Sequence, residues 1–242
     1  MSKLWLKKIQ DLVFPPLCVF CSTPSTVSLC CVRCRALLPF NVTACERCAT
    51  PLTTTDGACA ACRQQRLAFV SAIAPLKYEF PIDMAIKSWK FRRNLFYLPV
   101  FSDLLLRALR KHLLDADGLV PVPLHRWRQA SRGFNQALEL AEVISRRSGL
   151  PIAKNVTRVR ATKTQSGLTA EERKQNLQNA FSVSGPLAIR RPVIVDDVMT
   201  TGETCNQLAT TLLSAGAERV YVLTIARAEP GRCYAAGGIV NV

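Results

Sequence analysis

Two adjacent carboxylates, Asp196 and Asp197, directly follow the apolar run 193–195 and precede a Thr-Thr-Gly turn. Ionised carboxylates only accept hydrogen bonds, which suits them to the hydroxyl groups of a ribose. The turn offers hydroxyl and backbone N–H groups where a helix is predicted to begin, and helix N-termini favour phosphate. The sequence therefore predicts a sugar-phosphate site with Asp196 and Asp197 as catalytic residues. The binding residues assigned to it are Val198, Met199, Thr200, Thr201, Gly202, Glu203 and Thr204.

The alternative for this stretch is an ordinary strand–helix turn in which Asp and Thr serve as capping residues. Capping alone does not account for two consecutive aspartates after an apolar strand, so we favour the ligand site. The stretch from Val193 to Thr204 resembles the phosphoribosyl pyrophosphate (PRPP) loop of type I phosphoribosyltransferases. This resemblance implies that the carboxylates hold the ribose and that the turn holds its 5′-phosphate.

Three arginines lie without an intervening acid in the segment that follows a second predicted strand. The planar guanidinium group matches phosphate oxygens in pairs, so this segment is a candidate cradle for a diphosphate. Taken alone, a basic surface without a ligand is the alternative. A sugar that carries a diphosphate needs a second anion site, which favours the cradle. We assign to it Pro123, Leu124, Arg126 and Arg132.

Nine of the eleven cysteines lie within residues 18–62, and eight of them form four Cys-x-x-Cys pairs. Two such pairs supply the four thiolates of a closed tetrahedral zinc site, so the array predicts two structural zinc ions. Redox thiols are the alternative, but four repeated pairs favour metal. The spacing leaves open whether neighbouring or alternating pairs share a zinc ion, and Cys30 is left over. The predicted ligands are Cys18, Cys21, Cys31, Cys34, Cys45, Cys48, Cys59 and Cys62.

Composition limits the classes of protein that this chain can represent. Of its 242 residues, 49% are hydrophobic, which is enough for a sizeable core. The net charge of +15 favours acidic partners such as nucleic acid, phosphorylated metabolites or anionic membranes, although a solvated basic surface is also compatible with it. Lys7 and Lys8 interrupt the apolar N-terminus, and no apolar stretch approaches the roughly 20 residues of a membrane span. We therefore expect a cytoplasmic protein, in which paired cysteines bind metal.

Alternating strands and helices must position the carboxylates and the basic segment. They predict an α/β fold, with a parallel sheet and helices on both faces, behind a small N-terminal cysteine-rich zinc-ribbon domain. We divide the chain into a zinc-ribbon part (1–66), a phosphoribosyltransferase-like part (67–228) and a tail (229–242). Strands are predicted over 70–78, 118–123, 151–156, 180–183, 193–195 and 220–226, and helices over 81–91, 101–114, 133–148 and 203–214, with a further helix beginning at Thr169.

These motifs, in this order, resemble the ComF/GntX family of predicted phosphoribosyltransferases. The resemblance rests on the cysteine pairs, on Arg132-Gly-Phe-Asn-Gln136, on residues 162–168 and on Val195-Asp-Asp-Val-Met-Thr-Thr-Gly202. It implies a double zinc ribbon, a type I phosphoribosyltransferase core and PRPP as ligand, which would bring Mg²⁺. It also implies a link to DNA uptake or to DNA utilisation, with other DNA-uptake proteins as partners. It adds Lys90 and Gln165 to the substrate site.

Two functions from different classes stay open. One is an enzyme that transfers the phosphoribosyl group of PRPP to an acceptor base; no residue stands out as its general base. The other is a single-stranded-DNA-binding competence factor whose PRPP site is regulatory or vestigial. In the second, cations would follow the strand while Trp89, Phe91, Trp127 and Phe134 stack on bases, unless these aromatic residues belong to the core. The predicted nucleic-acid contacts are Lys87, Lys90, Arg92, Arg93, Arg126 and Arg128.

Overall fold

A computed structural model describes residues 15–25, 29–54, 57–113, 115–125, 133–159 and 180–229. None of the helices in these ranges is both long and apolar enough to cross a membrane. The elements, in chain order, are α2 (Val32–Ala36), α3 (Ala60–Gln64), β1 (Ser71–Ile73), β2 (Leu76–Lys77), α4 (Ile82–Arg92), η1 (Leu95–Tyr97), α5 (Leu98–His112), β3 (Gly118–Pro121), α7 (Gln136–Ser148), β4 (Val156–Arg158), β5 (Phe181–Val183), β6 (Pro192–Met199), α9 (Glu203–Ser214) and β7 (Tyr221–Arg227).

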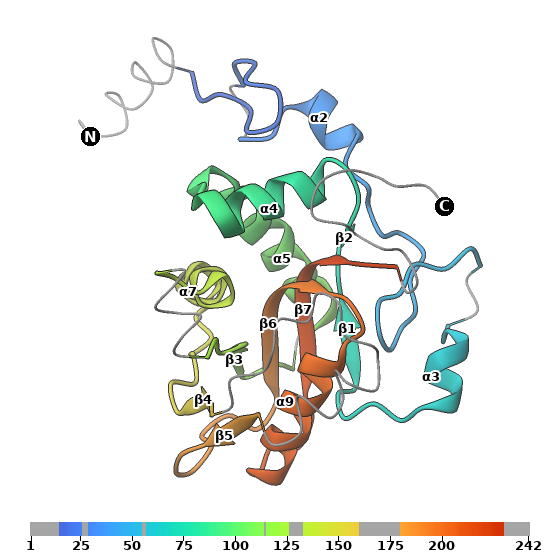
Figure 1. Cartoon of the computed structure of the whole chain (residues 1–242), viewed down its shortest axis with the longest axis vertical. Helices are drawn as coiled ribbons and strands as arrows, with labels where there is room; N and C mark the ends of the chain where they lie inside the picture. The colour runs from blue at the N-terminus through green and yellow to red at the C-terminus, as the bar shows by residue number, and fades with distance from the viewer. Residues whose placement is uncertain are drawn as a thin grey trace.

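Five strands form one parallel sheet in the order β1-β7-β6-β3, and β2 pairs with β7 beyond the end of β1 (Figure 1). Strand β6 lies between β7 and β3 and is therefore internal. Its residues Val193, Ile194 and Val195 are fully buried. A parallel sheet that is covered on both faces requires such a continuous apolar run.

Helices cover both faces of the sheet, which confirms the predicted α/β fold class. Helices α4, α5 and α7 share a core with Val193 and Val195, whereas α9 shares a second core with Ile194 and Val222. Successive side chains of a strand point to opposite faces, so β6 contributes to both cores. The arrangement is visible in Figure 1, where α7 and α9 lie on different sides of β6.

Apart from shifted element ends and the short helices α2, α3 and η1, the structure differs from the predicted strands at three places. The single strand expected over 70–78 is divided into β1 and β2 at Pro75, which has no N–H group to donate to a ladder. Strand β6 continues to Met199 and so includes both aspartates, because its pairing with β7 continues to that residue. The strand expected over 151–156 is reduced to one bridge from Ile152 to β3, and β4 instead pairs antiparallel with β5.

Candidate functional site

A cleft of about 350 Å³ opens at the carboxyl end of β6. Open α/β sheets bind their ligands at this edge. All residues from Asp196 to Cys205 line the cleft, and of the other predicted residues Lys90 and Leu124 do so too. Pro123 is partly buried and is not among the lining residues. The predictions that lie outside the described residues are Arg126, Arg128, Arg132, Gln165, Trp127 and the helix start at Thr169.

The Thr-Thr-Gly turn leads from β6 into α9. Gly202 precedes the helix with φ of 82°, a left-handed conformation that costs other residues energy, which explains a glycine here. Gly202 is the N-cap residue of α9 and has no side chain that could accept from the first N–H groups of the helix. The Glu203 N–H group donates to Thr201 Oγ1 at 3.4 Å. The first N–H groups of a helix lack intrahelical partners. The turn can therefore offer N–H groups and hydroxyls to an anion in the cleft.

Asp197 is held by a lysine from a different layer of the fold. Its carboxylate lies 2.8 Å from the ammonium group of Lys90 in α4, and both side chains are largely buried. The neighbouring Trp89 is fully buried and donates its indole N–H to Glu139 of α7 at 3.2 Å. This contact fixes α4 against α7 and so fixes the position from which Lys90 reaches Asp197.

Asp196 has a different electrostatic environment from Asp197. Its pKa is raised to about 7, first by desolvation and second by the negative charge of Asp197. The positive charges of Lys90 and Arg158 and the N–H group of Asp197 act in the opposite direction. A carboxyl group in a cleft whose pKa is raised by burial and by a neighbouring carboxylate is a candidate functional group.

Several residues lining the cleft are absent from the predicted site. Arg158 is buried at the end of β4, with its guanidinium group 5.5 Å from the centre of the Phe181 ring. Gln136, the first residue of α7, is 3% exposed and also lines the cleft. Tyr78 follows β2 and approaches from the same edge. Placing the residues at the predicted strand end near 78 and at the start of the predicted helix near 136 beside this edge would have found Tyr78 and Gln136. Arg158 lies on β4, which pairs with β5 outside the parallel sheet, so its place in the cleft depends on that tertiary pairing.

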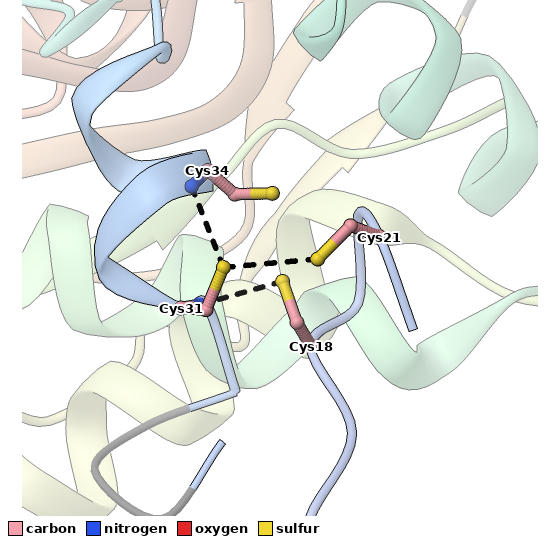
Figure 2. Close-up of side chains that lie close together, drawn as sticks. All are labelled: Cys18, Cys21, Cys31 and Cys34. Carbon is pink, nitrogen blue, oxygen red and sulfur yellow. Dashed lines mark hydrogen bonds between the residues drawn. The ribbon is translucent and has the colours of Figure 1, made fainter. Parts of the chain in front are cut away.

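The eight predicted zinc ligands form two groups of four. Within each group the ligand atoms all lie within 4.8 Å of one another, and neighbouring pairs share a site, which answers the question that the spacing left open. Figure 2 shows the first group, in which four side chains converge from residues 18–21 and from the start of α2. Sulfur atoms approach to 3.7 Å in the first group and 3.6 Å in the second. A tetrahedron with Zn–S bonds of about 2.3 Å has edges of about 3.8 Å, so both groups fit zinc.

The described members of the predicted nucleic-acid set lie in α4 or at its end and differ in their surroundings. Lys90 faces Asp197 in the cleft, and Lys87 pairs with Asp83 within α4. Arg92 and Arg93 are exposed at the end of that helix. Of the aromatic residues named with them, two are buried, in agreement with the core alternative, whereas Phe91 is 74% exposed; the buried ones are Trp89 and Phe134.

Comparisons with known proteins identify the family. A family model described as a double zinc ribbon domain matches residues 9–63. The chain is 35% identical to competence protein F of Haemophilus influenzae over 193 residues, which covers 76% of this chain and 84% of that protein. It is 38% identical to the DNA utilization protein YhgH of Escherichia coli over 230 residues, 89% of this chain and 99% of that protein. The chain belongs to the family of these two proteins.

Membership in the competence protein F and YhgH family confirms the resemblance found in the sequence, and the double zinc ribbon confirms the N-terminal part of the predicted fold. Among solved structures, orotate phosphoribosyltransferase from Aeropyrum pernix overlaps 53% of this chain and 70% of its own, with 19% identity and a TM-score of 0.35. Because this score is low, the α/β fold class rests on the strand order and the two helix layers described above.

Proposed function

We propose that the cleft binds PRPP and that the protein transfers its phosphoribosyl group to a nitrogen base, in DNA uptake or DNA utilisation. One observation carries the proposal: the carboxylate pair and the glycine turn at the start of α9 line the same cleft. Phosphate needs the N–H groups of such a turn, and sugar hydroxyls need acceptors. A ligand that carries both groups uses both halves of the site.

The ligand would lie along the edge of the sheet. Its 5′-phosphate would bind the turn at 200–204, and its ribose hydroxyls would donate to Asp196 and Asp197. The diphosphate would lie toward the start of α7, beside the cation of Arg158 in the cleft. Arg126 and Arg132, assigned from the arginine pattern, and Gln165, assigned from the family resemblance, remain predictions for its binding. Mg²⁺ would enter with PRPP, held by diphosphate oxygens and water.

The reaction would be a displacement at the anomeric carbon. The lone pair of the base nitrogen forms the new bond to that carbon while the bond to the diphosphate oxygen breaks, and the diphosphate leaves with the electron pair. The transition state carries positive charge on the ribose, which the carboxylates stabilise. The cations on the lining of the cleft stabilise the negative charge of the leaving group. Because the cleft positions both reactants, the chain itself need not supply a strong base.

Calorimetry with PRPP and Mg²⁺ tests this assignment. We expect the double substitution Asp196→Ala and Asp197→Ala to abolish measurable binding and to leave two zinc ions per chain. Asp103→Ala is the control, because that carboxylate pairs with Arg107 and Arg147 on the surface. Equal PRPP affinity in the double variant and the wild type would contradict the site. If the wild type binds PRPP and the double variant does not, a screen of nucleobases for diphosphate release identifies the acceptor.

A second candidate function, binding of single-stranded DNA, is favoured by one surface feature. Phe91 and Phe96 are 74% and 77% exposed, and the exposed residues Arg92 and Arg93 lie between them in the chain. Exposed aromatic rings beside cations stack on bases and hold the backbone of a single strand. We expect Phe91→Ala with Phe96→Ala to weaken oligonucleotide binding, measured by fluorescence anisotropy, by about tenfold or more. The exposed control Val42→Ala should bind as the wild type does, and equal affinities in all three would remove this candidate.

A further inference from the structure

A buried arginine at the end of the central sheet contacts both the phosphate turn and the second zinc group. Arg227 is the last residue of β7 and is 3% exposed. Its Nε donates to the carbonyl of Cys48 at 2.8 Å. One terminal nitrogen, Nη1, contacts the carbonyls of Met199 at 3.0 Å, of Ala228 at 3.0 Å and of Thr200. The guanidinium group thus joins main-chain atoms that are about 150 residues apart in the sequence, as the numbering shows.

The contacts on the turn side fix the direction of two peptide groups. In a planar trans peptide the C=O and the following N–H point in opposite directions. When the carbonyls of Met199 and Thr200 point to Arg227, the N–H groups of Thr200 and Thr201 point away from it. Both threonines line the cleft. Arg227, together with the Ala228 N–H group that also donates to the Met199 carbonyl at 3.0 Å, therefore sets which N–H groups the turn presents to an anion.

The contacts on the ribbon side reach a zinc ligand through one hydroxyl. The second terminal nitrogen of Arg227 donates to Thr50 Oγ1 at 2.9 Å. The same oxygen lies 3.1 Å from Cys48 Sγ, and since it accepts from arginine, its own hydrogen is free to go to the sulfur. A zinc ion with four thiolates carries a net negative charge, which stabilises a buried cation that is linked to it. The relay runs from Cys48 through Thr50 and Arg227 to the turn.

We propose that Arg227 is a positioning residue through which the zinc group of Cys45, Cys48, Cys59 and Cys62 holds the phosphate turn in its binding conformation. This inference rests on the proposed binding of a 5′-phosphate at that turn. It gives the second zinc ribbon a role in ligand affinity in addition to folding.

The first zinc group provides a matched control. Cys21 and Thr23 repeat the arrangement of Cys48 and Thr50, with Cys21 Sγ 3.2 Å from Thr23 Oγ1. The hydrogen bonds that the four ligands Cys18, Cys21, Cys31 and Cys34 make lie within residues 18–37, far from the turn in the sequence. Valine has nearly the shape of threonine but no hydroxyl group. Thr50→Val and Thr23→Val therefore remove equivalent hydroxyls with little change in packing, but only Thr50→Val breaks the relay.

The experiment compares the zinc-loaded variants Thr50→Val, Thr50→Ser, Thr23→Val and Arg227→Lys with the wild type. Three quantities are measured: zinc per chain, PRPP affinity by calorimetry, and hydrogen exchange of the amides at 199–204 without ligand. We expect Thr50→Val and Arg227→Lys to keep two zinc ions, to lose affinity by about tenfold and to exchange faster at the turn. Thr50→Ser keeps the hydroxyl and should behave as the wild type, as should Thr23→Val.

The outcomes separate this inference from the proposed function. If the wild type binds PRPP and Thr50→Val matches Thr23→Val in affinity and in exchange, the relay is wrong. If the wild type does not bind PRPP, the proposed function fails, and exchange alone decides the relay. Faster exchange in Thr50→Val than in Thr23→Val then supports it, and equal exchange overturns it. Should Arg227→Lys fail to fold, the threonine variants still decide.

Discussion

Two lysines one turn apart in α4 make ion pairs of similar length in different surroundings. Lys87 lies 3.1 Å from Asp83 on the same helix, and Lys90 lies 2.8 Å from Asp197 across the cleft. The side chains of Lys87 and Asp83 are 29% and 19% exposed, and those of Lys90 and Asp197 are 22% and 9% exposed. An i,i+4 pair within one helix contributes about 0.5 kcal/mol, whereas removing the partner of the more buried Asp197 leaves its charge without compensation, which costs about 3 kcal/mol. We expect Lys90→Met to lower the free energy of unfolding several times more than Lys87→Met does. Denaturant unfolding measures both, and equal losses would show that the Lys90 pair is not buried in solution.

The raised pKa of Asp196 predicts how stability depends on pH. The folded protein keeps this proton up to about pH 7, whereas the unfolded chain loses it near the ordinary value of 3.8. The unfolded state therefore binds fewer protons between these values, and the free energy of unfolding falls as pH rises from about 4 to 7. The slope is at most about 1.4 kcal/mol per pH unit.

Asp196→Asn removes this titration, so its unfolding free energy should depend less on pH between 4 and 7 than that of the wild type. Asp103→Asn is the control. Desolvation acts to raise the pKa of Asp103, but hydrogen bonds from Arg107 and Arg147 outweigh it and lower the pKa. Asp103 therefore titrates below pH 4 in the folded protein. The free energy of unfolding of Asp103→Asn should depend on pH between 4 and 7 as that of the wild type does. Parallel curves for Asp196→Asn and the wild type would show that Asp196 titrates normally.

At the scale of elements, the two ribbons are predicted to take up zinc with release of protons. Desolvation acts to raise the pKa of Cys18, but backbone N–H groups, led by that of Cys31, lower it to about 6. Desolvation and the neighbouring thiols raise the pKa of Cys34 far above neutral pH. A tetrathiolate site needs all four thiols ionised, so zinc must displace the protons that remain.

We expect elemental analysis to give two zinc ions per chain, and one after either Cys18→Ser or Cys45→Ser. Titration of zinc into the apoprotein at pH 7 should acidify a weakly buffered solution. Removal of zinc by a chelator should unfold both ribbons, because Leu38 and Ala49 are the buried apolar residues other than cysteine among their described residues, so metal must supply most of the folding energy. A zinc content near zero in freshly purified protein would contradict the ribbon assignment.

The elements show why part of the site was predictable from the sequence. Asp196 to Gly202 form one local unit, a strand end with its turn, so their residue types disclosed both the element and the chemistry. The pairing of cysteines into two groups depends on chain paths that equal spacings do not specify. Arg227 was missed because its acceptors Cys48 and Thr50 come from the far end of the chain.

At the scale of the whole molecule, the net charge of +15 predicts a strong dependence of DNA binding on salt. Each phosphate neutralised on a single strand contributes about −0.7 to the slope of log affinity against log salt concentration. If the exposed end of α4 is the contact surface, Arg92 and Arg93 should each neutralise about one phosphate and so contribute about −0.7 each to this slope. We expect Arg92→Gln with Arg93→Gln to make the slope shallower by about 1.4. An unchanged slope would place the contact elsewhere on the molecule.

The hydrogen bond from Trp89 to Glu139 has a practical consequence. The indole ring of Trp89 is fully buried and held by this hydrogen bond, and the next residue, Lys90, forms an ion pair with Asp197. A sugar that draws Asp197 away from Lys90 would change the electric field at the ring, and the emission wavelength of tryptophan responds to such fields. Intrinsic fluorescence of a variant with Trp5 and Trp127 replaced by phenylalanine should therefore report occupancy of the cleft without any attached dye.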